Sequence, residues 1–185
     1  MEQALIFASI IVGVAVSDQI LSLNRLLRAD APVRWHWAVP FTALLILLTN
    51  LQVWWSLAGE PAEKISIGEF LPILVQLILI ALLSAASLPD EVPDEGIDLK
   101  QYYQHHARYV WTLFALGLVW AEVIAVIDAV TNDHSMFDLV ANRTIDIVVI
   151  AVMVGLAFVR RWWLIALGIG FLYLGPLNWL SRTLN

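Results

Sequence analysis

The sequence contains no cysteine, which excludes disulfide bonds, thiol nucleophiles and cysteine-ligated zinc sites. Charged residues are also few, at 14% of the chain against about 25% in an ordinary soluble domain. The net charge of −6 argues against a nucleic-acid partner and against a polybasic lipid anchor. The chain also lacks a Ser-His-Asp order, a Gly-rich phosphate loop and an HExxH motif, so we expect no enzymatic activity.

The four histidines offer no metal or haem site. His36, His105, His106 and His134 all fall at the edges of apolar segments or in loops. No two of them face each other at a spacing of three or four residues across an apolar segment. We therefore expect no metal and no cofactor.

Apolar residues dominate what is present. They make up 61% of the sequence and fall in blocks of about 20 residues, the length that a helix needs to cross ~30 Å of hydrocarbon. Several of the nine tryptophans lie at block ends, where an aromatic belt would meet the membrane surface. The first residues, MEQALIF, lack a basic segment and a cleavage site, so they predict a retained helix rather than a signal peptide. The chain is predicted to be an integral membrane protein.

Six spans are predicted, and they make the fold an all-α, polytopic transmembrane helical bundle. They cover residues 4–23, 37–57, 67–87, 110–130, 145–159 and 162–180. Only Arg160-Arg161 separates the last two, so one re-entrant hairpin is the alternative for that region. Gly175-Pro176 interrupts the sixth span late, and either kinks the helix or breaks it.

Basic residues predict the orientation of the spans. Placing the first, third and fifth connections in the cytoplasm gives that side seven of them: Arg25, Arg28, Arg34, Lys100, Arg108, Arg160 and Arg161. The other side then has three: Lys64, Arg143 and Arg182. Both termini are therefore predicted to face outward.

Residues 88–109 form the one long connection between spans. Its opening, LPDEVPDEGIDLK, combines prolines with clustered acids, which disfavours a helix there. Asp98 then has the position to cap a short interfacial helix from Gln101 to Tyr109. The connection is interpreted as a solvated linker followed by that helix, with docking of a partner protein as the alternative.

A possible internal repeat divides the chain into two three-helix halves, residues 1–87 and 110–185. At an offset of 104, Gly13-x-x-x-Ser17-Asp18 falls on Gly117-x-x-x-Ala121-Glu122. Three helices per half would make the halves inverted, an arrangement that recurs in transporters around a site near the midplane. The alternative is a chance match, since small residues are common in membrane helices.

The first helix of each half has small residues at a spacing of four. One seam is Ser9, Gly13 and Ser17, and the other is Gly117, Ala121, Ala125 and Ala129. This spacing places each seam on one helix face, where small side chains allow two backbones to approach closely. Helix packing explains the seams fully, but it does not explain the acids beside them.

Asp18 and Glu122 are the costly residues of the predicted spans. Asp18 lies about two thirds along its span, and Glu122 lies near the middle of the fourth. A charge at such depth costs roughly 2.5–3.5 kcal/mol on insertion scales. We expect no Lys or Arg at matching depth, which leaves a proton, a cation, a water-filled cavity or polar neighbours as partners. For Glu122 we favour a functional role over a packing role. For Asp18 a functional role and a structural one are equally favoured, because its side chain can also extend toward the membrane surface or meet Arg25.

Three amides are candidate neighbours of these acids: Asn50, Gln52 and Gln76. One polar interior containing all five side chains is the functional interpretation, and interhelical hydrogen bonds worth about 0.6 kcal/mol each are the packing interpretation. Glu69, Asp128 and Asp146 lie at the outer span ends, where they are interpreted as solvated caps or as an outer cation vestibule.

Two passages resemble a family of small bacterial six-span membrane proteins without an assigned function. They are residues 22–57, with Gln52-x-Trp54-Trp55, and residues 88–111, with Pro-Asp-Glu followed by Asp-Leu-x-x-Tyr-Tyr. The resemblance covers about a third of the chain, and implies a bacterial inner membrane and the same span layout, but no chemistry.

Two functions remain open from the sequence. The first is a homo-oligomeric transport or channel protein that moves protons or small cations past Glu122, Asp18, Gln76, Asn50 and Gln52. The second is a non-catalytic accessory subunit of a larger membrane complex, whose seams and Trp-rich ends bind partner helices. The lipid bilayer is the expected environment in both cases.

Overall fold

The computed structural model describes residues 2–59, 67–131 and 143–180, and in this part of the chain it has six helices and two very short strands. The helices are α1 (Glu2–Leu27), α2 (Ala38–Gly59), α3 (Ile67–Ala86), α4 (Leu99–Thr131), α6 (Thr144–Phe158) and α7 (Trp162–Leu180). The strands are β1 (Val33–Arg34) and β2 (Ile97–Asp98). Five helices are long and apolar enough to cross a membrane, and α6 is a shorter apolar helix of 15 residues. The prediction of an all-α membrane bundle is confirmed, and the chain is a multi-pass membrane protein.

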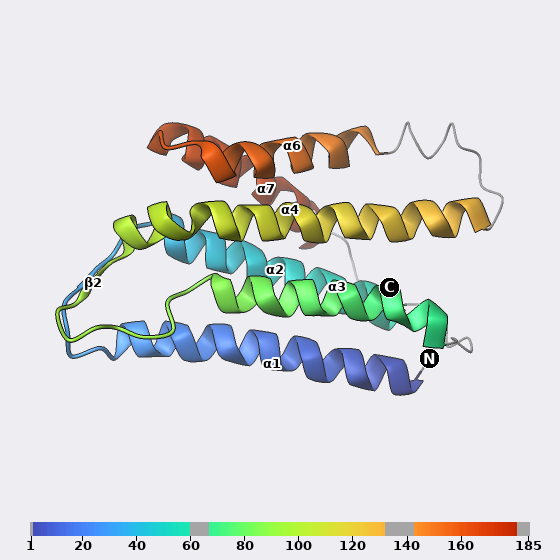
Figure 1. The fold of residues 1–185 in the computed structure, drawn as a ribbon, viewed down its shortest axis with the longest axis horizontal. Coiled ribbons are helices and arrows are strands. Elements are labelled where there is room, and N and C mark those ends of the chain that lie inside the picture. Colours follow the sequence, from blue (N-terminus) through green and yellow to red (C-terminus); the bar gives the residue numbers. More distant parts are fainter. Residues whose placement is uncertain (1, 60–66, 132–142, 181–185) are drawn as a thin grey trace.

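The helices run alternately in opposite directions along one long axis (Figure 1). Residues 28–37, 87–98 and 159–161 therefore meet at one end of the bundle, here called the connector end. At the other end, here called the terminal end, α1 begins; α7 runs toward this end but stops short of it. The up-and-down order agrees with the predicted span layout, while the assignment of the connector end to the cytoplasm stays a prediction.

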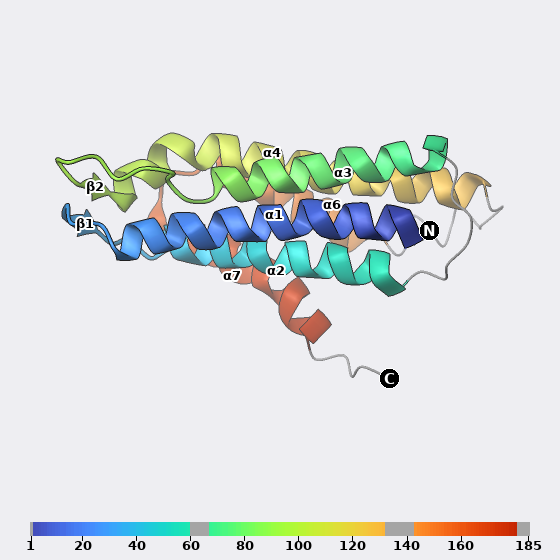
Figure 2. The same ribbon diagram turned by 90° about the horizontal axis from the view of Figure 1, so that it is seen from below.

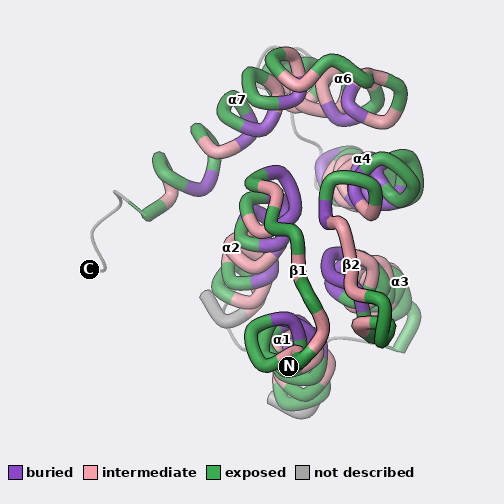
Figure 3. Tube along the Cα trace, turned by 90° about the vertical axis from the view of Figure 1, so that its left-hand side faces the viewer, coloured by how far each residue is buried: buried purple, intermediate pink, exposed green. Residues whose placement is uncertain are grey.

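The helices form two groups around the core (Figure 3). Helix α1 packs on α2 and α3, α3 packs on α4, and α6 and α7 lie over α4 and α2. The core between α2, α4 and the start of α7 contains Trp111, Leu45 and Ile165, each at most 2% exposed. Many large apolar side chains on the outer sides of the helices are exposed, as expected for surfaces that contact lipid.

Helix α4 is one continuous helix of 33 residues, so the predicted boundary between a short interfacial helix and the fourth span is wrong. Its beginning was predicted correctly: the Asp98 carboxylate accepts hydrogen bonds from the backbone N–H groups of Lys100, at 2.8 Å, and Gln101. No proline follows within the helix to end it near Tyr109. At 1.5 Å per residue α4 is about 50 Å long, well beyond the ~30 Å of hydrocarbon.

The acidic connection folds back against the first connection, which the sequence did not predict. Strands β1 and β2 pair in parallel, with Val33 opposite Ile97 and Arg34 opposite Asp98. The Ile97 N–H donates to the Pro32 carbonyl oxygen at 3.1 Å, and Arg25 donates to the Asp90 carbonyl oxygen at 3.1 Å. Residues 88–98 are thus anchored on the bundle rather than forming a loose linker.

The two proposed halves pack differently. In the first half α1 lies along α3, whereas in the second half α4 lies along α6 and α7 crosses over to α2. This difference follows from α6, which is too short to match α4, and from the tilt of α7 away from the bundle (Figure 2). The internal repeat stays a prediction from the sequence.

Candidate functional site

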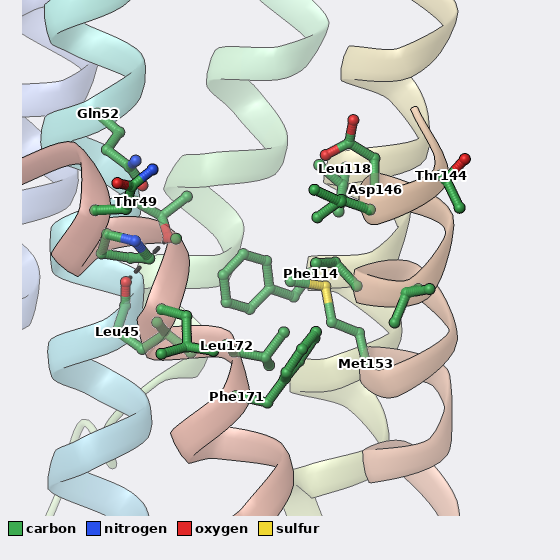
Figure 4. Close-up of a pocket in the computed structure, with 17 residues that line it drawn as sticks. Leu45, Thr49, Gln52, Phe114, Leu118, Thr144, Asp146, Met153, Phe171 and Leu172 are labelled. Atoms are coloured by element: carbon green, nitrogen blue, oxygen red, sulfur yellow. Dashed lines mark hydrogen bonds between the residues drawn. The ribbon is translucent and has the colours of Figure 1, made fainter. Parts of the chain in front are cut away.

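A cavity of about 750 Å³ lies between α2, α4, α6 and α7 (Figure 4). It exists because α6 and α7 are in close contact near the connector end and then diverge (Figures 2 and 3). At the contact, a Cβ atom on Gly168 would lie only 2.8 Å from Cδ2 of Leu156, so any larger residue there would require the Leu156 side chain to move. Small-molecule sites in proteins typically measure about 300–1,000 Å³, and this cavity falls in that range.

The cavity has an apolar floor and a polar rim. The floor is formed by Leu45, Phe114, Met153, Phe171 and Leu172, and the rim by Thr49, Gln52, Thr144, Asp146 and Asn178. Chain direction orders the two along the bundle axis: on α2, α6 and α7, which contribute to both, the floor residues lie nearer the connector end than the rim residues. In Figure 4, Gln52 and Asp146 lie on facing walls, with Phe114 between them and lower in the cavity.

The cavity is closed on the side of the connector end. Beyond the floor, Trp111, Leu156, Ile165 and Ile169 are all at most 3% exposed and fill the space between the helices. The site is therefore a chamber that opens toward the terminal end. Among the described residues, the one ionisable side chain of the lining is Asp146, in the first turn of α6, where a carboxylate also complements the helix dipole.

A row of hydrogen-bonded side chains joins α1, α2 and α3 elsewhere in the bundle. Asn50 donates from Nδ2 to Oγ of Ser84 at 2.8 Å, and Ser87 donates from Oγ to the Ser84 carbonyl oxygen at 2.7 Å. Gln19 donates from Nε2 to Oγ of Ser87 at 3.0 Å and to the Ala43 carbonyl oxygen at 2.9 Å. The row links three helices through four side chains, which is the packing role that the sequence offered for Asn50.

Gln19 is the buried polar residue of α1, and it was not among the residues predicted from the sequence. It is 5% exposed and lies on the buried face with Ala8, Val12, Ala15 and Ser22. Its neighbour Asp18 lies on the flank of α1, half-buried, with no hydrogen bond or ion pair to another described side chain. The spacing of 4, 3 and 4 residues from Ala8 to Gln19 was the signal that separates the two positions.

Glu122 forms an ion pair with Arg143, so the expectation that no basic residue would lie at its depth is wrong. About a quarter of each side chain is exposed. Arg143 directly precedes α6, which at 15 residues is only about 22 Å long, and this short helix brings the arginine down to the level of Glu122. At the opposite end of α6, the Arg108 guanidinium lies 5.2 Å from the ring centroid of Phe158. Helix α6 is thus attached to α4 at both ends.

The five predicted site residues are distributed over different places. Gln52 is on the cavity rim, Asn50 is in the hydrogen-bonded row, and Glu122 is paired with Arg143. Gln76 lines a separate cavity of about 190 Å³ with Ala121, and its amide nitrogen lies next to Gly117. Among the described residues, none of the five bonds to another, so the structure does not form the single polar interior that the sequence suggested.

The two small-residue seams differ in their surroundings. On α4, Gly117 and Ala129 are buried and Ala121 and Ala125 are half-buried, in a face that packs against neighbouring helices. On α1, the Ser9 hydroxyl accepts a hydrogen bond from the Trp54 indole at 3.0 Å. Gly13 and Ser17 are exposed, and a Cβ atom on Gly13 would meet nothing within 4 Å. This part of the α1 seam faces outward from the bundle.

No protein-family model, curated protein or solved structure matches the chain. The resemblance to bacterial six-span proteins therefore stays a prediction, and the evidence on function comes from the cavity, the hydrogen-bonded row and the ion pair. In the part of the chain that the structure describes, no three His, Asp or Glu side chains are grouped to hold a metal ion.

An aromatic cluster around His36 joins the helices at the connector end. The His36 ring lies 4.2 Å from that of Trp162 and 5.5 Å from that of Trp37, measured between centroids. Burial, and secondarily the nearby Lys100 charge, hold the pKa of His36 below its ordinary value of about 6.5, while Asp98 acts in the opposite direction. The neutral imidazole is thus the form that the folded protein favours.

We expect the protein to lose stability as the pH falls from about 6.5 toward the lowered pKa of His36. In that window the unfolded chain binds a proton that the folded chain does not, so the free energy of unfolding rises with pH and levels off above it. Thermal unfolding in detergent at several pH values measures this slope. His36→Phe keeps an aromatic ring in the cluster and should flatten the slope; an unchanged slope would assign it to another group.

Proposed function

We propose that the protein is a small membrane carrier that binds one amphipathic molecule in the cavity between α2, α4, α6 and α7. The observation that carries this proposal is the ordered lining: an apolar floor toward the middle of the helices and a polar rim toward the terminal end. A ligand with an apolar body and a polar head matches this order when it lies along the bilayer normal. The diverging α6 and α7 would provide a route from the lipid into the chamber.

The rim also indicates the charge of the ligand head. Asp146 is the ionisable group of the lining, and Thr49, Gln52, Thr144 and Asn178 are neutral. The Thr49 hydroxyl donates to the Leu45 carbonyl oxygen in its own helix, at 3.0 Å, and keeps its acceptor capacity. The rim is therefore rich in acceptors, which suits a head that donates hydrogen bonds or carries a positive charge.

A proton or cation route through the bundle has less support. The idea depended on Glu122 as an uncompensated acid, and Arg143 now accounts for its charge. Asn50, the most buried of the predicted amides, is occupied with Ser84. Transport of an amphipathic molecule keeps the predicted class of function and changes the cargo.

Filling the cavity should abolish ligand binding without unfolding the protein. Val149 lines the cavity on α6, whereas Val154 on the same helix is exposed on its outer side. We expect Val149→Trp to weaken the binding of dodecylamine at least tenfold, about 1.4 kcal/mol, and Val154→Trp to leave it unchanged. Native mass spectrometry from mild detergent would count one bound amine per chain and give the relative affinity.

One further variant tests the role of the rim. Asp146→Asn should reduce the preference for dodecylamine over the uncharged dodecanol while leaving the dodecanol complex in place. Equal weakening by both tryptophan variants, or amine binding that does not saturate at one per chain, would overturn the proposal.

A second candidate, an accessory subunit of a membrane complex, is favoured by the outward face of α1. Gly13 and Ser17 are exposed there, and small residues allow a partner helix to approach closely in lipid. The same mild purification distinguishes the two functions. A second protein recovered in constant ratio, with no bound amphipathic molecule, would favour the accessory role.

A further inference from the structure

Four basic side chains gather at the junction of α4, α6 and α7, at the connector end. Lys100 and Arg108 come from α4, and Arg160 and Arg161 form the connection from α6 to α7; we call this set the basic junction. The Lys100 ammonium lies 5.5 Å from the ring centroid of Trp162, and the Arg108 guanidinium lies 5.2 Å from that of Phe158. Trp162 directly follows Arg161, and Phe158 lies two positions before Arg160, so both contacts bring the cations of α4 close to this connection.

No member of the basic junction forms an ion pair with another described residue. All four side chains are exposed, and none of them pairs with a carboxylate among the residues that the structure describes. Asp98, the acid nearest to Lys100 in sequence, uses its carboxylate to cap α4. The acidic connection lies against α1, where Asp90 meets Ser22 and Arg25, and also beside α4, where it lines a pocket with Tyr109. Folding thus brings together four cations that have no ion-pair partner in the described ranges, in a chain whose net charge is −6.

The surroundings of the basic junction are those of a lipid headgroup. Trp163 is 58% exposed and Tyr109 is 55% exposed, and such residues concentrate where a helix passes through the membrane surface. Phosphate oxygens are bound well by the fork of an arginine side chain, and the aromatic rings under Arg108 and Lys100 restrict their positions. We propose that the basic junction binds the phosphate headgroup of an anionic phospholipid.

This site is independent of the cavity ligand proposed above. The cavity opens toward the terminal end, whereas the basic junction lies at the connector end, beyond the buried layer of Trp111 and Ile165. The sequence does not reveal the site because no long run of basic residues exists: the four cations come from two segments, α4 and the α6–α7 connection, and span 61 positions from Lys100 to Arg161. The low net basic charge excluded a polybasic anchor, but not a cluster formed by folding.

The test compares two charge-matched double variants. Arg160→Gln with Arg161→Gln removes two charges from the basic junction, and Arg28→Gln with Arg34→Gln removes two exposed charges elsewhere at the connector end. Each protein is purified with mixed phosphatidylglycerol and phosphatidylcholine, and native mass spectrometry measures the lipid that stays bound. We expect the wild type and the Arg28/Arg34 variant to retain phosphatidylglycerol, and the Arg160/Arg161 variant to lose at least about tenfold in affinity.

Further measurements identify the ligand and distinguish a loss of binding from misfolding. Inorganic phosphate at millimolar concentration should not displace the lipid, since a free anion lacks the acyl chains. Arg160→Lys with Arg161→Lys keeps the charge but not the fork, and should bind phosphatidylglycerol with intermediate affinity if the junction is intact. Equal loss in both glutamine variants, or equal retention of the two lipids, would overturn the proposal. A third outcome would also overturn it: the wild type forms a dimer, and the Arg160/Arg161 variant loses the dimer but binds as much lipid. The basic junction would then bind the acidic connection of a second copy.

Discussion

Replacing Gly96 by alanine is expected to detach the acidic connection from β1 and to lower the free energy of unfolding by roughly 2–4 kcal/mol. Gly96 has a φ of +90°, in the region that side-chain-bearing residues rarely adopt. A Cβ atom there would also lie 2.3 Å from the Pro32 carbonyl oxygen and 2.8 Å from Pro32 Cγ. That oxygen cannot easily move away, because it accepts the hydrogen bond from Ile97 that begins the β1–β2 pair. Conformational strain and steric overlap therefore act together.

The control for this variant is Gly170→Ala in α7. A Cβ atom on Gly170 would meet nothing within 4 Å, and alanine is the better helix former by about 1 kcal/mol. Thermal unfolding in detergent would measure both variants, and limited proteolysis within residues 88–98 would report detachment of the connection. If Gly96→Ala behaves like Gly170→Ala in both measurements, the docked connection is not a significant part of the folded state.

The number and positions of the helices could be predicted because a bilayer imposes a strong length requirement on apolar segments. The second span was predicted at residues 37–57, and α2 covers Ala38–Gly59. The short α6 was also predicted, because Arg160-Arg161 ends the apolar segment. The existence of each helix is encoded locally, but its full length is not always: α4 begins eleven residues before the predicted fourth span.

The cavity could not be predicted, because it depends on how two helices cross. Gly168 allows α6 and α7 to meet at Leu156, but the sequence does not reveal that contact, nor the divergence beyond it that creates the chamber. The lining residues of α2 lie at positions 45, 49 and 52, a helical face that looks no different from a lipid-facing one. Tertiary geometry alone makes them a site.

The polar residues show a second limit of the sequence. Hydropathy identifies the most costly residue of α1, Asp18, but burial depends on the direction of the side chain, and the adjacent Gln19 faces the bundle instead. Glu122 was judged uncompensated because Arg143 was placed outside the membrane, beyond the predicted fifth span. That judgement is wrong because α6 is short. Its first residue lies nearer the middle of α4 than a longer helix would allow, and Arg143 therefore reaches Glu122.

Removing either member of the Glu122–Arg143 pair should destabilise the protein more than removing both. Glu122→Gln leaves Arg143 without its counter-ion at the side of α4, and Arg143→Gln leaves the Glu122 carboxylate without its counter-ion. Breaking a buried pair costs about 3–5 kcal/mol and an exposed pair about 0–1 kcal/mol, so for side chains that are a quarter exposed we expect roughly 2 kcal/mol for each single variant. The double variant has no unpaired charge, so its loss in free energy of unfolding should be at most half of the loss in either single variant.

Unfolding in mixed detergent micelles would give the four free energies of this double-mutant cycle. Asp18→Asn serves as the control, because it makes the same kind of change at an acid that pairs with no described basic residue, and it should leave the stability unchanged or raise it. Additive losses in the cycle would show that the pair contributes nothing to the fold. A stable Glu122→Gln protein that no longer carries protons or cations in liposomes would return the acid to the transport role that the sequence suggested. A positive coupling energy would instead identify the pair as the attachment of α6 to α4, which holds the rim residues Thr144 and Asp146 at the mouth of the cavity.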